Sequence, residues 1–151
     1  MSSALKLVGD GQELALAETQ AVLALASGEY RERLASVVAA VGEGEVAGEE
    51  LETLEEVLEL GLQSGRLRAL YGPGGEQSAL RLYRRLPRGA ALVESAEEVS
   101  RALAALRAKS IESISLSAVG PGAFALTVAA GGIELSLRLD RQGARLASVG
   151  V

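Results

Sequence analysis

Hydrophobic residues recur along the first two thirds of the chain at the spacing of amphipathic helices. Leu34, Val37, Val38 and Val41 follow an i, i+3, i+4, i+7 pattern, which places them on one face of a helix. The same criterion predicts helices in the neighbouring segments. The expected helices cover residues 27–42, 49–65, 76–86 and 94–110, after a segment 13–27 that starts extended and turns helical near Glu18.

Shorter segments between these helices show an alternating or broken pattern. Residues 5–8 (LKLV) read as a short strand, and residues 66–71 (RLRALY) alternate as expected for a strand or an extended link. Gly and Pro at 72–75 interrupt the chain, and Pro87 ends the helix that follows. Gly65 occupies the position where a glycine commonly ends a helix.

From Ile111 onwards the hydrophobic period changes from the helical spacing to two. Even-numbered residues 114–118 are apolar, and the odd-numbered positions 113–117 between them are serines. Such alternation is typical of an antiparallel sheet with one face in the core and one face in water. The predicted strands cover residues 111–119, 123–130, 133–140 and 144–151.

These patterns predict an α+β fold, in which N-terminal helices precede a C-terminal four-stranded antiparallel meander packed on a helix. Residues 1–90 form a mainly helical region with an acidic half and an Arg-rich helix, and residues 91–151 contain one helix and the sheet. At 151 residues, the two regions fit either two small parts or one continuous domain.

The closing segment 137–151, LRLDRQGARLASVGV, resembles the last strands of NTF2-like α+β cones. The resemblance rests on a helix followed by a meander and on the D-x-x-G turn at 140–143, and it covers the last third of the chain. It implies helices that cover one face of a curved sheet and form a pocket for a small molecule. The chain departs from the family at Arg145, where an aromatic residue often follows the turn, and it has no His for the family's His/Asp pairs.

Composition narrows the chemistry that the protein can perform. The chain is 48% hydrophobic but only 3% aromatic, so its core consists of small and aliphatic side chains. It has no His and no Cys, which removes the imidazole base, the thiolate nucleophile and the N and S ligands of zinc. We therefore predict no enzymatic activity, no cofactor and no transition metal.

The distribution of apolar residues also bears on location. No apolar run approaches the roughly 20 residues that cross a bilayer. The first residues carry one Lys and a short apolar run, without the hydrophobic region of a signal peptide. The sequence therefore predicts a cytoplasmic protein that does not insert into membranes.

Charge is distributed unevenly along the chain. Residues 1–60 carry a net charge of −10, residues 61–90 a net charge of +5, and residues 91–151 none. The segment 66–89 contains six arginines and one acid. These arginines are the candidate partner-binding residues: Arg66, Arg68, Arg81, Arg84, Arg85 and Arg88.

Three interpretations of the arginines remain open. They form an exposed or internally paired face, they bind a protein partner or second subunit, or they bind nucleic acid. A net charge of −5 argues against nucleic acid. The predicted helix over 49–65 offers a complementary acidic face with helical spacing. Its residues are Glu49, Glu52, Glu56 and Glu59.

Other candidate sites have weaker chemical support. The Gly-rich loop at 72–75 precedes a helix and could hold a phosphate, but Glu76 occupies the position that the anion would take. The serine face of the sheet has only Lys109 nearby in sequence as a base. We therefore predict a non-catalytic interaction or assembly subunit, acting through a protein partner or as a homo-oligomer. The alternatives are an NTF2-like pocket protein or weak enzyme, and a nucleic-acid-binding regulator.

Overall fold

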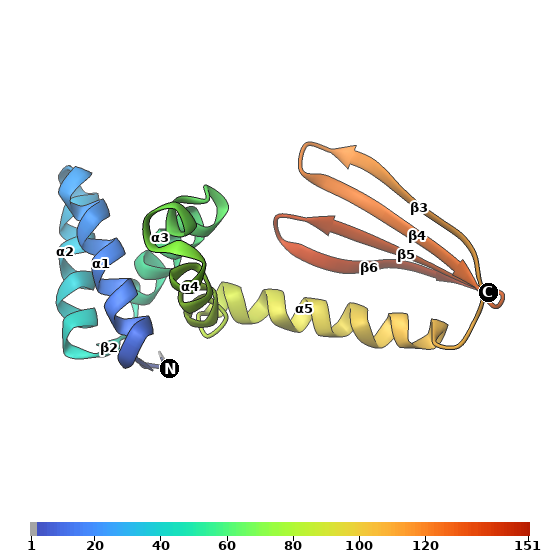
Figure 1. Ribbon diagram of the computed structural model, residues 1–151, viewed down its shortest axis with the longest axis horizontal. Helices are drawn as coiled ribbons and strands as arrows, with labels where there is room; N and C mark the ends of the chain where they lie inside the picture. Colours follow the sequence, from blue (N-terminus) through green and yellow to red (C-terminus); the bar gives the residue numbers. More distant parts are fainter. Residues whose placement is uncertain (1–2) are drawn as a thin grey trace. The chain divides into compact units, whose positions relative to one another are not determined.

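The computed structural model describes residues 3–151 and confirms the α+β fold (Figure 1). Helices occupy the N-terminal part of the chain, and a four-stranded antiparallel sheet with the order β3-β4-β5-β6 occupies the C-terminal part. The chain divides into two compact units, which we call the helical unit (Met1–Gly89) and the sheet unit (Ala90–Val151).

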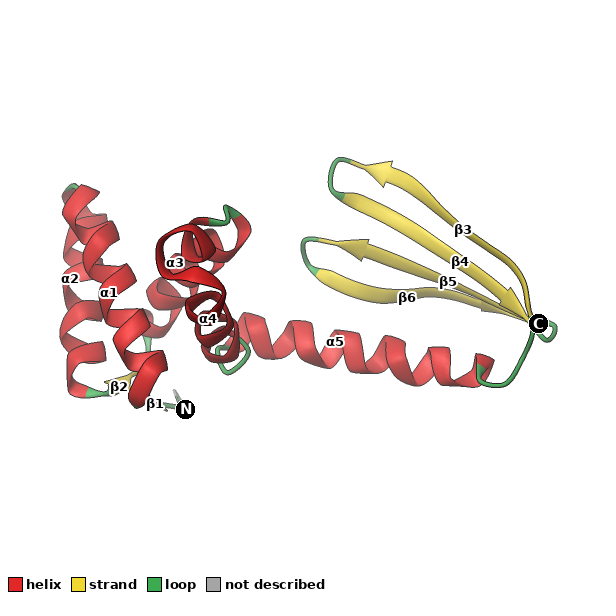
Figure 2. Ribbon diagram, viewed as in Figure 1, coloured by secondary structure: helices red, strands yellow, loops and turns green. Residues whose placement is uncertain are grey.

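The helical unit consists of packed helices (Figure 2) with an aliphatic core between them. Its elements are β1 (Leu5–Lys6), α1 (Gly9–Leu25), α2 (Gly28–Glu43), β2 (Glu45–Val46), α3 (Glu49–Gln63) and α4 (Arg66–Tyr83). Leu34, Leu54, Leu58 and Leu67 are fully buried there. The two short strands β1 and β2 pair with each other, so the segment before α1 is joined to the segment after α2.

Local sequence explains where α3 ends and α4 begins. Gly65 has a φ of 76°, a left-handed conformation that favours glycine, and it separates the two helices as predicted. α4 then bends at Gly72, whose φ of 73° and ψ of −179° are not helical. Pro73 follows directly, in the first turn of the next helical segment, where its missing N–H is not needed.

The sheet unit contains most of one helix and the meander. Its elements are α5 (Pro87–Leu103), whose first turn belongs to the helical unit, the 3₁₀ turn η1 (Ala104–Leu106), β3 (Ile111–Gly120), β4 (Ala123–Ala130), β5 (Ile133–Asp140) and β6 (Gly143–Gly150). α5 lies close to the β5–β6 turn, because a side chain at Gly143 would meet Leu92 and Ser95 of that helix. Val99 of α5 is buried.

Strand register gives the sheet one aliphatic face and one polar face. Leu116, Leu126, Leu137 and Leu146 form one row across the four strands of the aliphatic face. A parallel row on the same face starts at Ile114 and continues through the residues Val128, Leu135 and Val149. The four strands predicted for this sheet and their alternation are confirmed.

Three predicted boundaries are wrong. α1 begins at Gly9 rather than near Glu18, because its alternating Ala and Leu residues tolerate a helix as well as a strand. Residues 66–71 form the first turns of α4 rather than a strand. The last helix begins at Pro87 rather than near residue 94, because proline is well suited to the first turn of a helix.

Candidate interaction surface

The six candidate arginines do not share one face. α4 ends at Tyr83 and α5 begins at Pro87, so the helical spacing of the last four arginines is broken before Arg88. Arg68 and Arg81 contact residues of α4 itself, whereas Arg66, Arg85 and Arg88 contact three other elements. Arg68 pairs with Glu76, and the guanidinium of Arg85 donates to the carbonyl oxygen of Lys6 at 2.8 Å. Arg81 donates to Ser78, and Arg84 is exposed.

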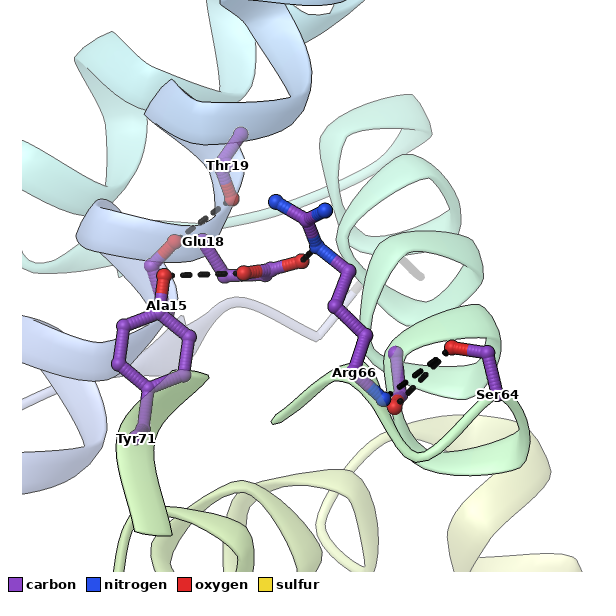
Figure 3. Close-up of polar contacts among 7 residues, drawn as sticks. Ala15, Glu18, Thr19, Ser64, Arg66 and Tyr71 are labelled. Atoms are coloured by element: carbon purple, nitrogen blue, oxygen red, sulfur yellow. Dashed lines mark hydrogen bonds and ion pairs between the residues drawn. The ribbon is translucent and has the colours of Figure 1, made fainter. Parts of the chain in front are cut away.

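Arg66 belongs to a buried polar cluster around Glu18 of α1 (Figure 3). The Glu18 side chain is 1% exposed; its Oε1 accepts from Arg66 Nε at 2.7 Å, and its Oε2 accepts from the Tyr71 hydroxyl at 2.9 Å. Neighbouring Thr19 donates to the carbonyl oxygen of Ala15. The cluster joins residues 48 and 53 positions apart in the sequence, so it ties α1 to α4.

The Glu18 cluster keeps the Tyr71 hydroxyl protonated. Burial raises the pKa of Tyr71 to about 12, and the hydrogen bond to the Glu18 carboxylate adds to the effect. A phenol with such a pKa is a poor acid or base near neutral pH. The cluster therefore links α1 to α4 through a hydroxyl that stays protonated near neutral pH.

A second buried carboxylate, Glu55, anchors the first turn of α5 to α3. Its side chain is 4% exposed; Oε2 accepts from the backbone N–H of Arg88 at 2.9 Å, and Oε1 lies 3.2 Å from the Arg88 Nε. Arg88 also donates to Glu59 at 3.0 Å. Burial raises the pKa of Glu55, and the backbone N–H and charge of Arg88 oppose that rise.

The predicted acidic face is only partly paired with the predicted arginines. Glu59 contacts Arg88, whereas Glu56 lies 3.8 Å from Arg33 of α2. Glu49 and Glu52 are exposed. Of the predicted arginines and the predicted acidic residues, the structure thus brings only Arg88 and Glu59 into contact.

Sequence reasoning missed the two buried acids, Glu18 and Glu55. A signal for Glu18 was present, because Glu18 and Thr19 follow Leu14 and Ala15 by one helical turn and lie on the buried side of α1. Glu55 similarly lies between the buried residues Leu54 and Val57.

The Gly-rich turn at 72–75 borders an open cleft of about 500 Å³. Tyr71, Ser78 and Arg81 line the cleft, together with the acidic residues Asp10 and Glu13. Two carboxylates at the rim disfavour a phosphate, which the glycine pattern alone would permit. Within residues 3–151, no buried side-chain nitrogen or oxygen lacks a hydrogen-bond partner.

The aliphatic face of the sheet is buried near its middle and exposed along its outer strands. The middle of the central strands is covered, since Val128, Leu135 and Leu137 are at most 5% exposed, whereas Phe124 near the start of β4 is 41% exposed. On the outer strand β3, Ile114 and Leu116 are each 61% exposed, and we call these two residues the β3 margin. Single exposed apolar residues are common, whereas Ile114 and Leu116 lie together beside an open strand edge.

The opposite outer strand, β6, also exposes apolar side chains. Leu146 and Val149 are 43% and 60% exposed on the same aliphatic face. On the polar face, Thr127 and Ser136 lie within 3.4 Å of each other through their hydroxyls. In the described part of the chain, β3 and β6 each pair with a strand on one side only.

Comparison of the chain with protein-family models, with curated proteins and with solved structures finds no match. No helix within residues 3–151 combines the length and the apolar character needed to span a membrane. In the same residues, no three acidic side chains gather as they would around a metal ion. Any assignment of function therefore rests on the surfaces described above.

Proposed function

We propose that the protein is a non-catalytic interaction subunit that self-associates through the aliphatic face and the open edge of its sheet. The observation that carries this proposal is the exposure of the β3 margin beside an unpaired strand edge. Exposed edges and apolar margins are features that natural proteins protect or use for binding. The proposal keeps the cytoplasmic location that the sequence predicts.

Full burial of a Leu or Ile side chain stabilises a protein by about 1.5–3 kcal/mol. Ile114 and Leu116 leave about three fifths of that contribution unused, since each is 61% exposed. Covering them would provide roughly 1–2 kcal/mol per residue toward an association. A second copy or partner that also pairs with the strand edge would add hydrogen bonds to this contribution.

The polar clusters favour interaction over catalysis as the role of the protein. The buried carboxylates of Glu18 and Glu55 are both held by arginines of the same unit. The arginines with acidic partners are also less available to a nucleic-acid backbone, which requires free positive charge.

Light scattering of the whole chain tests the proposal. We expect a mass above the 15.5 kDa of one chain at tens of micromolar. Leu116→Ser lowers the mass toward that of one chain, because it removes apolar contact at the margin. Leu60→Ser is the matched control, since Leu60 of α3 is also 61% exposed but lies in the helical unit. A wild-type chain that stays monomeric in this range refutes self-association.

A further inference from the structure

The two edges of the sheet differ in how well they could accept another strand. β3 has irregularities near its two ends, at Ile111/Ser113 and Ala118/Gly120, but between them it keeps an unbroken register with β4 from Ser113 to Ala118. Those six residues contain no charge and no proline. β6 has an irregularity in its register opposite Ser136 and Leu137. It also carries Arg145, which binds Asp140 at 2.6 Å. Bulges and charges of this kind protect sheet edges from pairing.

We propose that β3 pairs antiparallel with β3 of a second copy, so that two sheets join into one of eight strands. This inference rests on the proposed function and names its surface and partner. The unpaired backbone groups of β3 require an extended strand as occupant, because only a strand satisfies a row of alternating N–H and C=O groups.

The sequence of β3 is suited to pairing with itself. Directly opposite residues must lie on the same face, so a pairing about a two-fold axis keeps the apolar and serine faces continuous. With the axis at Ser115, Ile114 faces Leu116 of the partner subunit, and Ser113 faces Ser117 of the partner subunit. Large apolar side chains thus meet on one face and hydroxyls on the other.

Charge also permits this register. Glu112 is the only charged residue of β3, and it lies at the irregularity between Ile111 and Ser113, outside the regular segment, so the two copies of Glu112 lie at opposite ends of the paired strands. No acid meets another acid, so the pairing carries no direct repulsion. An axis moved to Leu116 would instead place Ile114 opposite Ala118 of the partner subunit and lose large apolar pairs. We therefore place the axis at Ser115.

The difference between the edges predicts a closed dimer. A pairing of β3 with β3 is isologous, since the same patch is used by both copies. The outer strands of the joined sheet are then the two β6 strands, which are irregular and charged. Further addition of strands is disfavoured there, so the assembly stops at two copies.

A cysteine placed on the proposed axis tests the pairing in the whole chain. The chain has no cysteine, so Ser115→Cys carries the sole thiol. Directly opposite residues of antiparallel strands have Cα atoms about 4.5–5.5 Å apart, which lies within the range of a disulfide. A register shifted by two residues separates them by about 7–8 Å, which a disulfide does not span.

Mild oxidation with oxidised glutathione, followed by non-reducing electrophoresis, reads out the bond. We expect Ser115→Cys to form a covalent dimer almost completely and Ser148→Cys to form little. Ser148 is a suitable control because it is an exposed serine on the same face of the other outer strand, β6. Circular dichroism before oxidation verifies that both variants keep the wild-type fold.

The outcomes separate this inference from the proposed function. Efficient bonding at Ser115 together with a dimeric wild-type mass supports both. An oligomeric wild type with no bond at Ser115, or with equal bonding at Ser148, overturns the β3 pairing and leaves self-association in place. A wild type that is monomeric at every concentration overturns both.

Discussion

Opposite charges at Ser115 provide a test of the dimer that does not disturb the core. Ser115 is exposed on β3 and lies on the proposed two-fold axis, so a substituted side chain faces its own counterpart. Ser115→Lys places two ammonium groups opposite each other, and Ser115→Glu does the same with two carboxylates. Each variant alone should dissociate, and a mixture of the two should associate again as a mixed dimer.

The size of the effect follows from Coulomb's law. Two unit charges about 6 Å apart interact by about 0.7 kcal/mol in water and by about 3 kcal/mol at the effective dielectric constant of a protein surface. Each like-charged dimer is therefore expected to dissociate about 3- to 100-fold more readily than wild type. The mixed dimer gains attraction of similar size, and salt near 1 M should suppress most of the difference between the two.

Sedimentation velocity of each variant and of the equimolar mixture measures these equilibria. The corresponding pair Ser148→Lys and Ser148→Glu is the control, and we expect neither a loss nor a rescue of association there. The pairing of β3 with β3 is refuted if the two Ser115 variants associate as wild type does, or if their mixture dissociates as far as each variant alone.

Two further predictions concern the helical unit. Gly89→Ala should destabilise it by about 1–3 kcal/mol in urea unfolding, because the added Cβ would overlap the backbone carbonyl group of Tyr83 and force the backbone to shift. Gly42→Ala, where a Cβ meets no other atom, should instead be stabilising by about 0.5–1 kcal/mol. Equal effects at the two glycines would contradict this account. The raised pKa of Tyr71, about 12 against 10.0, gives stability that is complete below the unfolded pKa and is lost as pH rises through the folded one. The loss attributable to Tyr71 should reach roughly 1 kcal/mol by about pH 11, and Tyr71→Phe should remove that part of the pH dependence, whereas an unchanged slope would exclude the cluster as its source.

The sheet could be predicted from the sequence because its signal is local. Alternating apolar and polar residues in β3 and β5, separated by Gly-containing turns, determine both the strands and the faces that they share. The difference between the edges was not predicted, because an irregular register is a property of two paired strands.

The helical unit was predicted less completely because its polar contacts join distant residues. Helices α2 and α3 follow from their apolar stripes, but the partners of Glu18 and Glu55 lie 33 to 53 residues away. The spacing of the arginines along one segment indicated a shared face. Because α4 ends at Tyr83 and α5 begins at Pro87, that face is interrupted. The arginines contact separate acids, the Ser78 hydroxyl and the Lys6 carbonyl oxygen instead.

Amide hydrogen exchange across β3, followed by NMR at increasing protein concentration, tests the central claim most directly. Every second N–H of an edge strand points away from its neighbour and exchanges freely in a monomer. If β3 is the interface, the outward N–H groups between Ser113 and Ala118 become protected as the concentration rises, and those of β6 do not. Outward β3 amides that exchange equally fast at every concentration would contradict the account.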